Sequence, residues 1–207
     1  EVSLNVPDHK RFILKENSKD TKIALGNFKL VYHGTITKRL GVDLAIQAVA
    51  KLMCKIPGLE FHIYGIGDDV VEFKELSKSL KVDHAVFINR GVPIESIVSI
   101  LDGMDLGIIA NRKNIATELM LPVKMLEYIA LNIPVIAPRL KTIQYYFTDE
   151  MVNFFEPGII DDMARAILEL YNDKSKRVKQ VQMARKFIEK YGWEHHQMDL
   201  VNFYNKL

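Results

Sequence analysis

Short β-branched and aromatic runs alternate along this chain with longer amphipathic segments. The runs have the length and composition of buried strands and lie at residues 28–33, 59–64, 85–88, 105–109, 134–137 and 152–155. Between them, apolar residues recur every three or four positions, as on one face of a helix, over residues 42–53, 70–80, 94–101, 123–131, 160–170 and 174–190. Repeated βα units of this kind predict an α/β fold with a doubly wound, Rossmann-like parallel sheet.

Composition excludes several other classes of protein. With 48% hydrophobic and 26% charged residues in 207, the chain has globular composition rather than that of a disordered or fibrous protein. The 28 Lys and Arg against 26 Asp and Glu leave a net charge of only +2, which does not indicate a nucleic-acid partner. No apolar run approaches the roughly 18 residues that a membrane span needs.

The single cysteine, Cys54, cannot form a disulfide within the chain, and no Cys/His cluster has zinc-site spacing. We therefore expect a reducing, cytoplasmic location and no structural metal. The chain opens at Glu1 on polar sequence, so we expect it to be part of a longer protein. Residues 1–27 are interpreted as a lead-in segment with little core of its own, and residues 28–207 as one domain.

The last predicted helix has an apolar side and a basic side. The basic residues are Lys174, Lys176, Arg177, Lys179, Arg185, Lys186 and Lys190. Peripheral association with a membrane is one interpretation of this stripe, and a solvated helix face is the favoured one.

In doubly wound sheets, ligands bind outside the carboxyl ends of the strands. The loop after the first strand, residues 34–41, has a glycine, Gly34, that allows close backbone approach and a following helix start that favours anions. Lys38 and Arg39 add positive charge that would suit a diphosphate. The loop lacks a G-x-G-x-x-G pattern, which disfavours a dehydrogenase-type dinucleotide site. An exposed loop with incidental basic residues is an equally good interpretation of this segment alone.

Two further segments are candidates for ligand contact. After the second strand, Gly65 and Gly67 permit a tight turn and Asp68 or Asp69 can cap the next helix, so turn chemistry is favoured there. Glu127 lies in a largely apolar helical segment, where an unpaired carboxylate would be costly. Its partner is either a ligand, such as a pair of ribose hydroxyls, which we favour, or a basic residue such as Lys124.

Taken in order, these segments resemble a known family. The matching residues are Asn5, Val6, Pro7, Asp8, Phe12, the run from Lys38 to Asp43, Gly65-Ile66-Gly67, Val86-Phe87, Val92-Pro93, Met104-Asp105, Pro122, Lys124, Glu127, Tyr128, Pro-Val-Ile-Ala at 134–137, and Trp193. The chain is similar to the C-terminal, donor-binding domain of GT-B fold retaining glycosyltransferases, known as family 4 or glycosyl transferases group 1. The resemblance covers essentially the whole chain and is most specific over residues 122–137.

Three positions depart from the family pattern. Many members have an arginine directly after the loop glycine, where this chain has Thr35, and a lysine before the next glycine, where it has Leu40. The first of two acidic family residues falls at Leu119, one step after Glu118, whereas the second falls on Glu127. The resemblance therefore transfers Glu127 more directly than Glu118.

The resemblance implies transfer of a hexose from a nucleotide diphosphate-sugar to an acceptor with retained anomeric configuration, without a metal or other cofactor. The expected catalytic residues are Lys38 and Arg39, which would stabilise the departing diphosphate, and Glu118, which would contact the sugar. The other expected donor contacts are Gly34, Thr35, Gly65, Gly67, Asn89, Arg90, Leu119, Leu121, Lys124 and Glu127, with Glu127 at the ribose.

The acceptor would be a glycan, a lipid-linked sugar or another glycoconjugate, as in polysaccharide biosynthesis. It would bind an N-terminal domain that this chain does not contain, so we expect the chain to bind donor but not to turn over by itself. Two alternatives stay open: a nucleotide-sugar-binding domain without activity, and part of a nonhydrolysing sugar-nucleotide epimerase.

Overall fold

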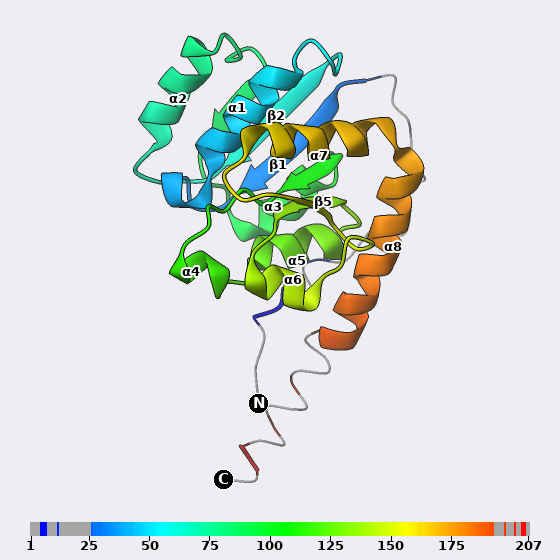
Figure 1. Cartoon of the computed structure of the whole chain (residues 1–207). Helices are drawn as coiled ribbons and strands as arrows, with labels where there is room; N and C mark the ends of the chain where they lie inside the picture. The colour runs from blue at the N-terminus through cyan, green and yellow to red at the C-terminus, as the bar shows by residue number, and fades with distance from the viewer. Residues whose placement is uncertain are drawn as a thin grey trace.

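Six parallel strands form one sheet in the order β3-β2-β1-β4-β5-β6 in the computed structural model. Figure 1 shows this sheet with β1, β2 and β5 labelled. The strands are β1 (Phe28–His33), β2 (Leu59–Tyr64), β3 (Val86–Asn89), β4 (Leu106–Ile108), β5 (Val135–Pro138) and β6 (Asn153–Phe155). The structure describes residues 5–7, 12 and 26–192, together with positions 197, 201, 204 and 205. All six predicted strands are confirmed, with ends that move by one residue at most, because buried β-branched runs specify the strands well.

Helices cover both faces of the sheet (Figure 1). They are α1 (Val42–Leu52), α2 (Val70–Ser79), α3 (Ile94–Leu101), α4 (Ile115–Glu118), α5 (Val123–Ala130), α6 (Lys141–Tyr146), α7 (Ile160–Asn172) and α8 (Lys174–Tyr191), with a 3-10 turn, η1, at Lys38–Leu40. The six predicted helices are confirmed as α1, α2, α3, α5, α7 and α8. The prediction missed α4, α6 and η1, because segments this short contain too few turns for a periodic pattern.

The core lies in two clusters, one on each face of the sheet. Helices α1 and α7 pack with Leu30 and Tyr32 in the first cluster, whereas α5 and α8 pack with Val31 in the second. Successive side chains of β1 thus enter opposite clusters, as the period of a strand requires. Because both faces are buried, the strands read as continuous apolar runs, and the predicted doubly wound α/β fold is confirmed.

Part of the lead-in segment packs on the domain. Phe12 is 6% exposed and belongs to the second core cluster, and Val6 packs against the same cluster. These residues extend the core of the domain rather than forming one of their own. Asp8 and Trp193, which contribute to the family resemblance, lie outside the described residues.

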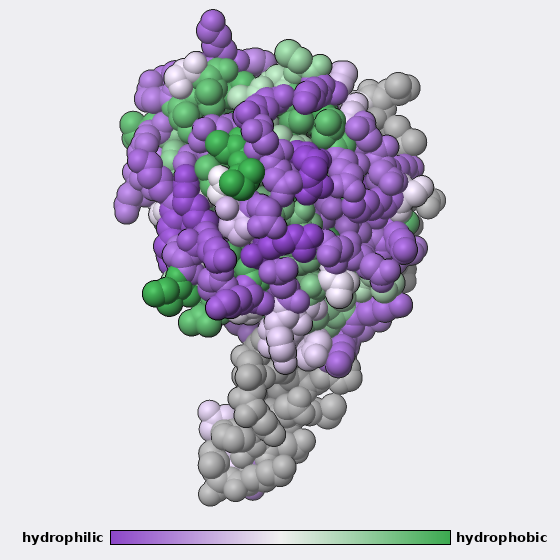
Figure 2. Space-filling view, in the orientation of Figure 1, coloured by the Kyte–Doolittle hydropathy of each residue, from purple (hydrophilic) through white to green (hydrophobic). Residues whose placement is uncertain are grey.

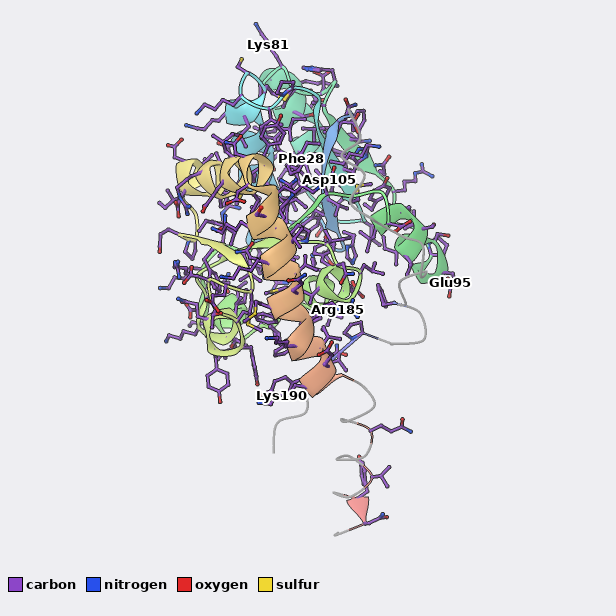
Figure 3. The ribbon with its side chains drawn as sticks, turned by 90° about the vertical axis from the view of Figure 1, so that its right-hand side faces the viewer. Phe28, Lys81, Glu95, Asp105, Arg185 and Lys190 are labelled. Atoms are coloured by element: carbon purple, nitrogen blue, oxygen red, sulfur yellow. The ribbon has the colours of Figure 1, made fainter. Side chains whose placement is uncertain are left out.

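The basic residues of α8 divide into two groups. Lys176 donates to Asn153 Oδ1 at 3.0 Å, and Arg177 lies over the Phe28 ring, so these two attach α8 to β6 and β1. Others, including Arg185 and Lys190 in Figure 3, are exposed along the helix. The stripe is therefore partly structural and partly solvated. Within the described residues, no helix is long and apolar enough to cross a membrane.

Candidate functional site

The strand order reverses between β1 and β4, which places the expected ligand crevice at the carboxyl ends of these central strands. Three loops are joined there by backbone hydrogen bonds. Gly34 N–H donates to Tyr64 O at 2.9 Å, Ile36 N–H to Ile66 O at 2.9 Å, and Gly65 N–H to Asn89 O at 3.3 Å. The loops after β1, β2 and β3 therefore lie side by side, as the topology predicts.

The glycines of these loops are required by close backbone packing. A Cβ on Gly65 would lie 1.8 Å from the Gly34 carbonyl oxygen, and one on Gly67 would lie 2.0 Å from the Ile36 carbonyl oxygen. Gly34 itself has φ +118°, a conformation that favours glycine. This packing explains Gly65 and Gly67 as loop residues, in line with the favoured turn interpretation, and their contact with a ligand stays a prediction.

We expect Gly65→Ala to destabilise the domain by about 1–3 kcal/mol, because the added methyl group overlaps backbone that cannot move without separating the two loops. Gly91→Ala is a matched control, because its Cβ would meet nothing closer than 3.5 Å. Thermal melting of both variants tests the packing argument. Equal melting temperatures for the two would contradict it.

The predicted diphosphate residues Lys38 and Arg39 are both exposed at the carboxyl end of the β1 loop. Lys38 Nζ pairs with Glu72 Oε1 at 2.7 Å, a hydrogen bond that raises the pKa of Lys38. Its backbone N–H donates to Asp69 Oδ2 at 2.7 Å. Asp69 does occupy the N-cap position of α2, but its carboxylate fixes the β1 loop instead of bonding the helix. The Lys38 ammonium would have to exchange Glu72 for a ligand.

Sequence reasoning missed an ion pair beneath this loop. Arg112, after β4, makes a two-pronged contact with Asp43 of α1 at 2.6 and 2.7 Å. The same guanidinium donates to the Lys38 carbonyl oxygen and so joins the loops after β1 and β4. The one signal was the buried aspartate of Gly41-Val42-Asp43, which needs a partner in the core.

Glu118 is buried at the end of α4 and holds the start of α6. Its Oε2 accepts from the Lys141 backbone N–H at 3.1 Å, and its carbonyl oxygen accepts from Thr142 Oγ1 at 2.8 Å. These bonds give Glu118 a structural use, while its predicted sugar contact stays untested. Next to it Leu119 is 75% exposed and Ile115 85% exposed, and Figure 2 shows apolar surface where α4 lies.

Glu127 has a partner that the sequence did not suggest. His33, the last residue of β1, places its Nε2 at 2.5 Å from Glu127 Oε2 and its Nδ1 at 3.0 Å from the Tyr128 hydroxyl. The side chains of His33 and Glu127 are each 13% exposed. The alternative of a basic partner is thus realised by His33 rather than by a hydrogen bond to Lys124. Ribose binding at Glu127 stays a prediction.

Lys124 extends instead to the β1 loop. Its Nζ lies 3.8 Å from the centre of the Tyr32 ring and 3.0 Å from where a Gly34 Cβ would stand. The ammonium is shielded from solvent and has no hydrogen-bond partner within the described residues. Burial lowers the pKa of Lys124 to about 7, and the nearby Glu127 carboxylate only partly offsets this effect.

Other predicted site residues lie at the same end of the sheet. Asn89 ends β3 beside Gly65, Arg90 follows it and is exposed, and Thr35 is exposed in the β1 loop. Leu121 packs partly buried against the second core cluster. Within the described ranges, no three His, Cys, Asp or Glu residues are grouped to hold a metal ion. Metal-independent chemistry stays a prediction.

Comparison of the structure with solved structures finds glycosyltransferase domains of the same fold. The C-terminal domain of LpcC, a glycosyl transferase group 1 family protein from Francisella tularensis, has a TM-score of 0.73 and 23% identity over 89% of this chain and 97% of that one. Anabaena HepE in complex with UDP has a TM-score of 0.84 and 13% identity over 100% of this chain. Staphylococcus aureus TarM, also in complex with UDP, has a TM-score of 0.72 and 19% identity over 93% of this chain.

This chain spans only part of the longer relatives: 57% of HepE and 38% of TarM. A comparison with curated proteins finds no match. The family model of the glycosyl transferases group 1 matches residues 14–187, which is most of the sequence. The same region contains the whole described sheet and the loops at its carboxyl edge. The chain therefore belongs to the glycosyl transferases group 1 family.

Proposed function

We propose that this chain is the donor-binding half of a retaining hexosyltransferase of family 4 and binds a nucleotide diphosphate-sugar. The observation that carries the proposal is the convergence of the Gly34 loop, the Lys124 ammonium and the Glu127 carboxylate at the topological switch point. Cations beside a loop glycine suit a diphosphate, and a fixed carboxylate suits ribose hydroxyls. HepE and TarM, which share the fold, have been solved with UDP, which supports a uridine nucleotide as the first candidate.

The Glu127 carboxylate is held in a fixed orientation in which it could accept hydrogen bonds from a ribose. His33 bonds one oxygen of Glu127, Oε2, and so fixes the orientation of the group at the end of β1. Two ribose hydroxyls would donate to this carboxylate, and charge-assisted bonds of this kind are stronger than neutral ones. The base would then lie toward the loops after β2 and β3, along Gly65 and Asn89.

The reaction would break the bond between the anomeric carbon and the diphosphate oxygen, whose electron pair leaves with the nucleotide. An acceptor hydroxyl oxygen bonds the anomeric carbon on the same face, and its proton passes to the departing diphosphate oxygen. Lys38, Arg39 and Lys124 would stabilise the negative charge that develops on the diphosphate. The acceptor would bind a separate N-terminal half, in keeping with the greater length of HepE.

The test is a calorimetric titration of this chain with UDP-, GDP- and ADP-sugars, in buffer containing EDTA. We expect one of them to bind with full affinity without added metal, since cationic side chains supply the positive charge. Binding that is seen without EDTA but lost in EDTA would contradict metal independence. Absence of binding both with and without EDTA would contradict the donor site. The full-length protein then separates the alternatives: an epimerase would interconvert sugar-nucleotides without an acceptor, and an inactive domain would only bind them.

A further inference from the structure

The ammonium group of Lys124 is buried without an acceptor. Its Nζ is inaccessible to solvent and bonded to none of the described residues, and its close contact is the face of the Tyr32 ring at 3.8 Å. Attraction to a ring face only partly compensates an ammonium for the loss of water. A buried ammonium without an acceptor must either lose its proton and become a neutral amine or bind an anion that the free protein does not provide.

The position of this ammonium suggests what the anion is. Nζ stands at the loop glycine Gly34, 3.0 Å from a Cβ placed there, so that any side chain at this position would be in tight contact with it. The loop is the one that bonds the turn after β2 at the carboxyl edge of the sheet. Lys38, one of the two cations expected at this loop, is instead exposed and paired with Glu72.

The groups that face Lys124 do not satisfy it. From β1 the facing group is Tyr32, whose pKa burial raises, and from α5 it is Glu127, which is itself paired with His33. Burial also raises the pKa of the Tyr128 phenol, so both phenols stay neutral. Glu127 favours the charged ammonium through space but is bonded to His33. Arg39, whose charge acts on Tyr32, adds a second cation nearby. The surroundings thus favour an incoming anion.

We propose that Lys124 Nζ binds the diphosphate oxygens of the donor, and that the site takes up one proton from solvent at this nitrogen as the nucleotide binds. This inference rests on the proposed function and adds to it a direct bond from Lys124 Nζ to the diphosphate oxygens and a dependence on pH. Many family members have an arginine at the position of Thr35 in the β1 loop. In this chain the inference assigns the role of that cation to Lys124 on α5.

The direction of the pH effect follows from the free site. Because burial lowers the pKa of Lys124 to about 7, the amine of the free protein is mostly neutral above that pH. The diphosphate favours the ammonium, so binding above pH 7 must add a proton. Affinity should therefore be highest near or below pH 7 and should fall toward a tenfold loss per pH unit between pH 8 and 9.

The experiment is a calorimetric titration at pH 8 in two buffers of different ionisation enthalpy, which reports the protons taken up per nucleotide. The ligand is the nucleotide-sugar that binds most tightly among UDP-glucose, GDP-mannose and ADP-glucose. Its diphosphate is esterified at both ends, so it does not titrate here as a terminal phosphate does near pH ~6. We expect an uptake of roughly 0.9 proton for a pKa near 7.

Three variants make the test specific. Lys124→Met should weaken binding at pH 7 at least tenfold and abolish the uptake, and Lys124→Arg, if it binds, should do so without uptake. Lys186→Met, on the exposed side of α8, is the matched control and should behave as wild type. Wild-type binding without proton uptake, or uptake that persists in Lys124→Met, would overturn this inference and leave the proposed function standing. A wild-type protein that binds none of the donors would overturn both.

Discussion

Replacing Lys124 with methionine is expected to raise the melting temperature of this domain at pH 7 while its donor affinity falls. The side chain keeps its length and its contact with Tyr32, but the buried, unbonded ammonium is removed. A pKa lowered from 10.5 to about 7 corresponds to a destabilisation of up to roughly 4 kcal/mol at neutral pH. For a domain of this size, that is a rise on the order of 5–15 °C.

The Lys124→Met substitution should also change how the stability of the domain depends on pH. The folded pKa of Lys124 is depressed, so between about pH 7 and 10.5 the unfolded chain binds more protons, and wild-type stability rises with pH across that window. Below pH 7 the full destabilisation is present. The advantage of Lys124→Met should therefore shrink from pH 7 to pH 10. Melting curves in buffers free of phosphate measure this, and a variant that melts lower than wild type at pH 7 would contradict it.

Glu127→Gln is expected to weaken nucleotide binding by about 1–3 kcal/mol, because it keeps the shape of the side chain but removes the charge that strengthens its hydrogen bonds to the ribose. The loss should be smaller for a 2′-deoxy donor, in which one hydroxyl partner is already missing. Calorimetric titration with the ribo and deoxy donors measures both effects.

Melting temperature distinguishes this role from a structural one. Glutamine can keep one hydrogen bond to His33, so the melting temperature of Glu127→Gln should change little. If the pair with His33 were the only purpose of Glu127, the variant would melt clearly lower and bind the nucleotide as wild type does. A destabilised protein with unchanged affinity would end the ribose assignment.

The sequence predicted the strands and long helices well, because apolar periodicity is a property of local segments. Buried runs such as Phe28–His33 have one reasonable interpretation, and helix α3, Ile94–Leu101, matches its prediction at both ends. Helix α4 has 4 residues and was missed, because one turn carries no period. Its capping box, Asn114 with Thr117, was the available local signal.

The site was predicted less completely, because its contacts join distant parts of the chain. The loops were located from the topology rule alone, but His33 and Glu127 are 94 positions apart, and no local pattern links them. The glycines Gly65 and Gly67 were identified as turn residues, whereas their packing on the β1 loop depends on the register of β1 with β2. Burial of the Lys124 ammonium likewise results from packing of α5 on β1.

The central claim is that the donor binds at the carboxyl edge of the sheet. The most direct test is to locate a bound nucleotide by measuring the backbone amide chemical shifts during titration with UDP. We expect the largest shifts at Gly34, at Gly65 and at the start of α5 near Lys124. The described surface offers a competing hollow between α1 and α7, which is lined by Lys51, Lys55 and Arg165 and by no residue of these loops. Shifts centred on that hollow, with Gly34 and Gly65 unmoved, would contradict a donor site at the carboxyl edge of the sheet.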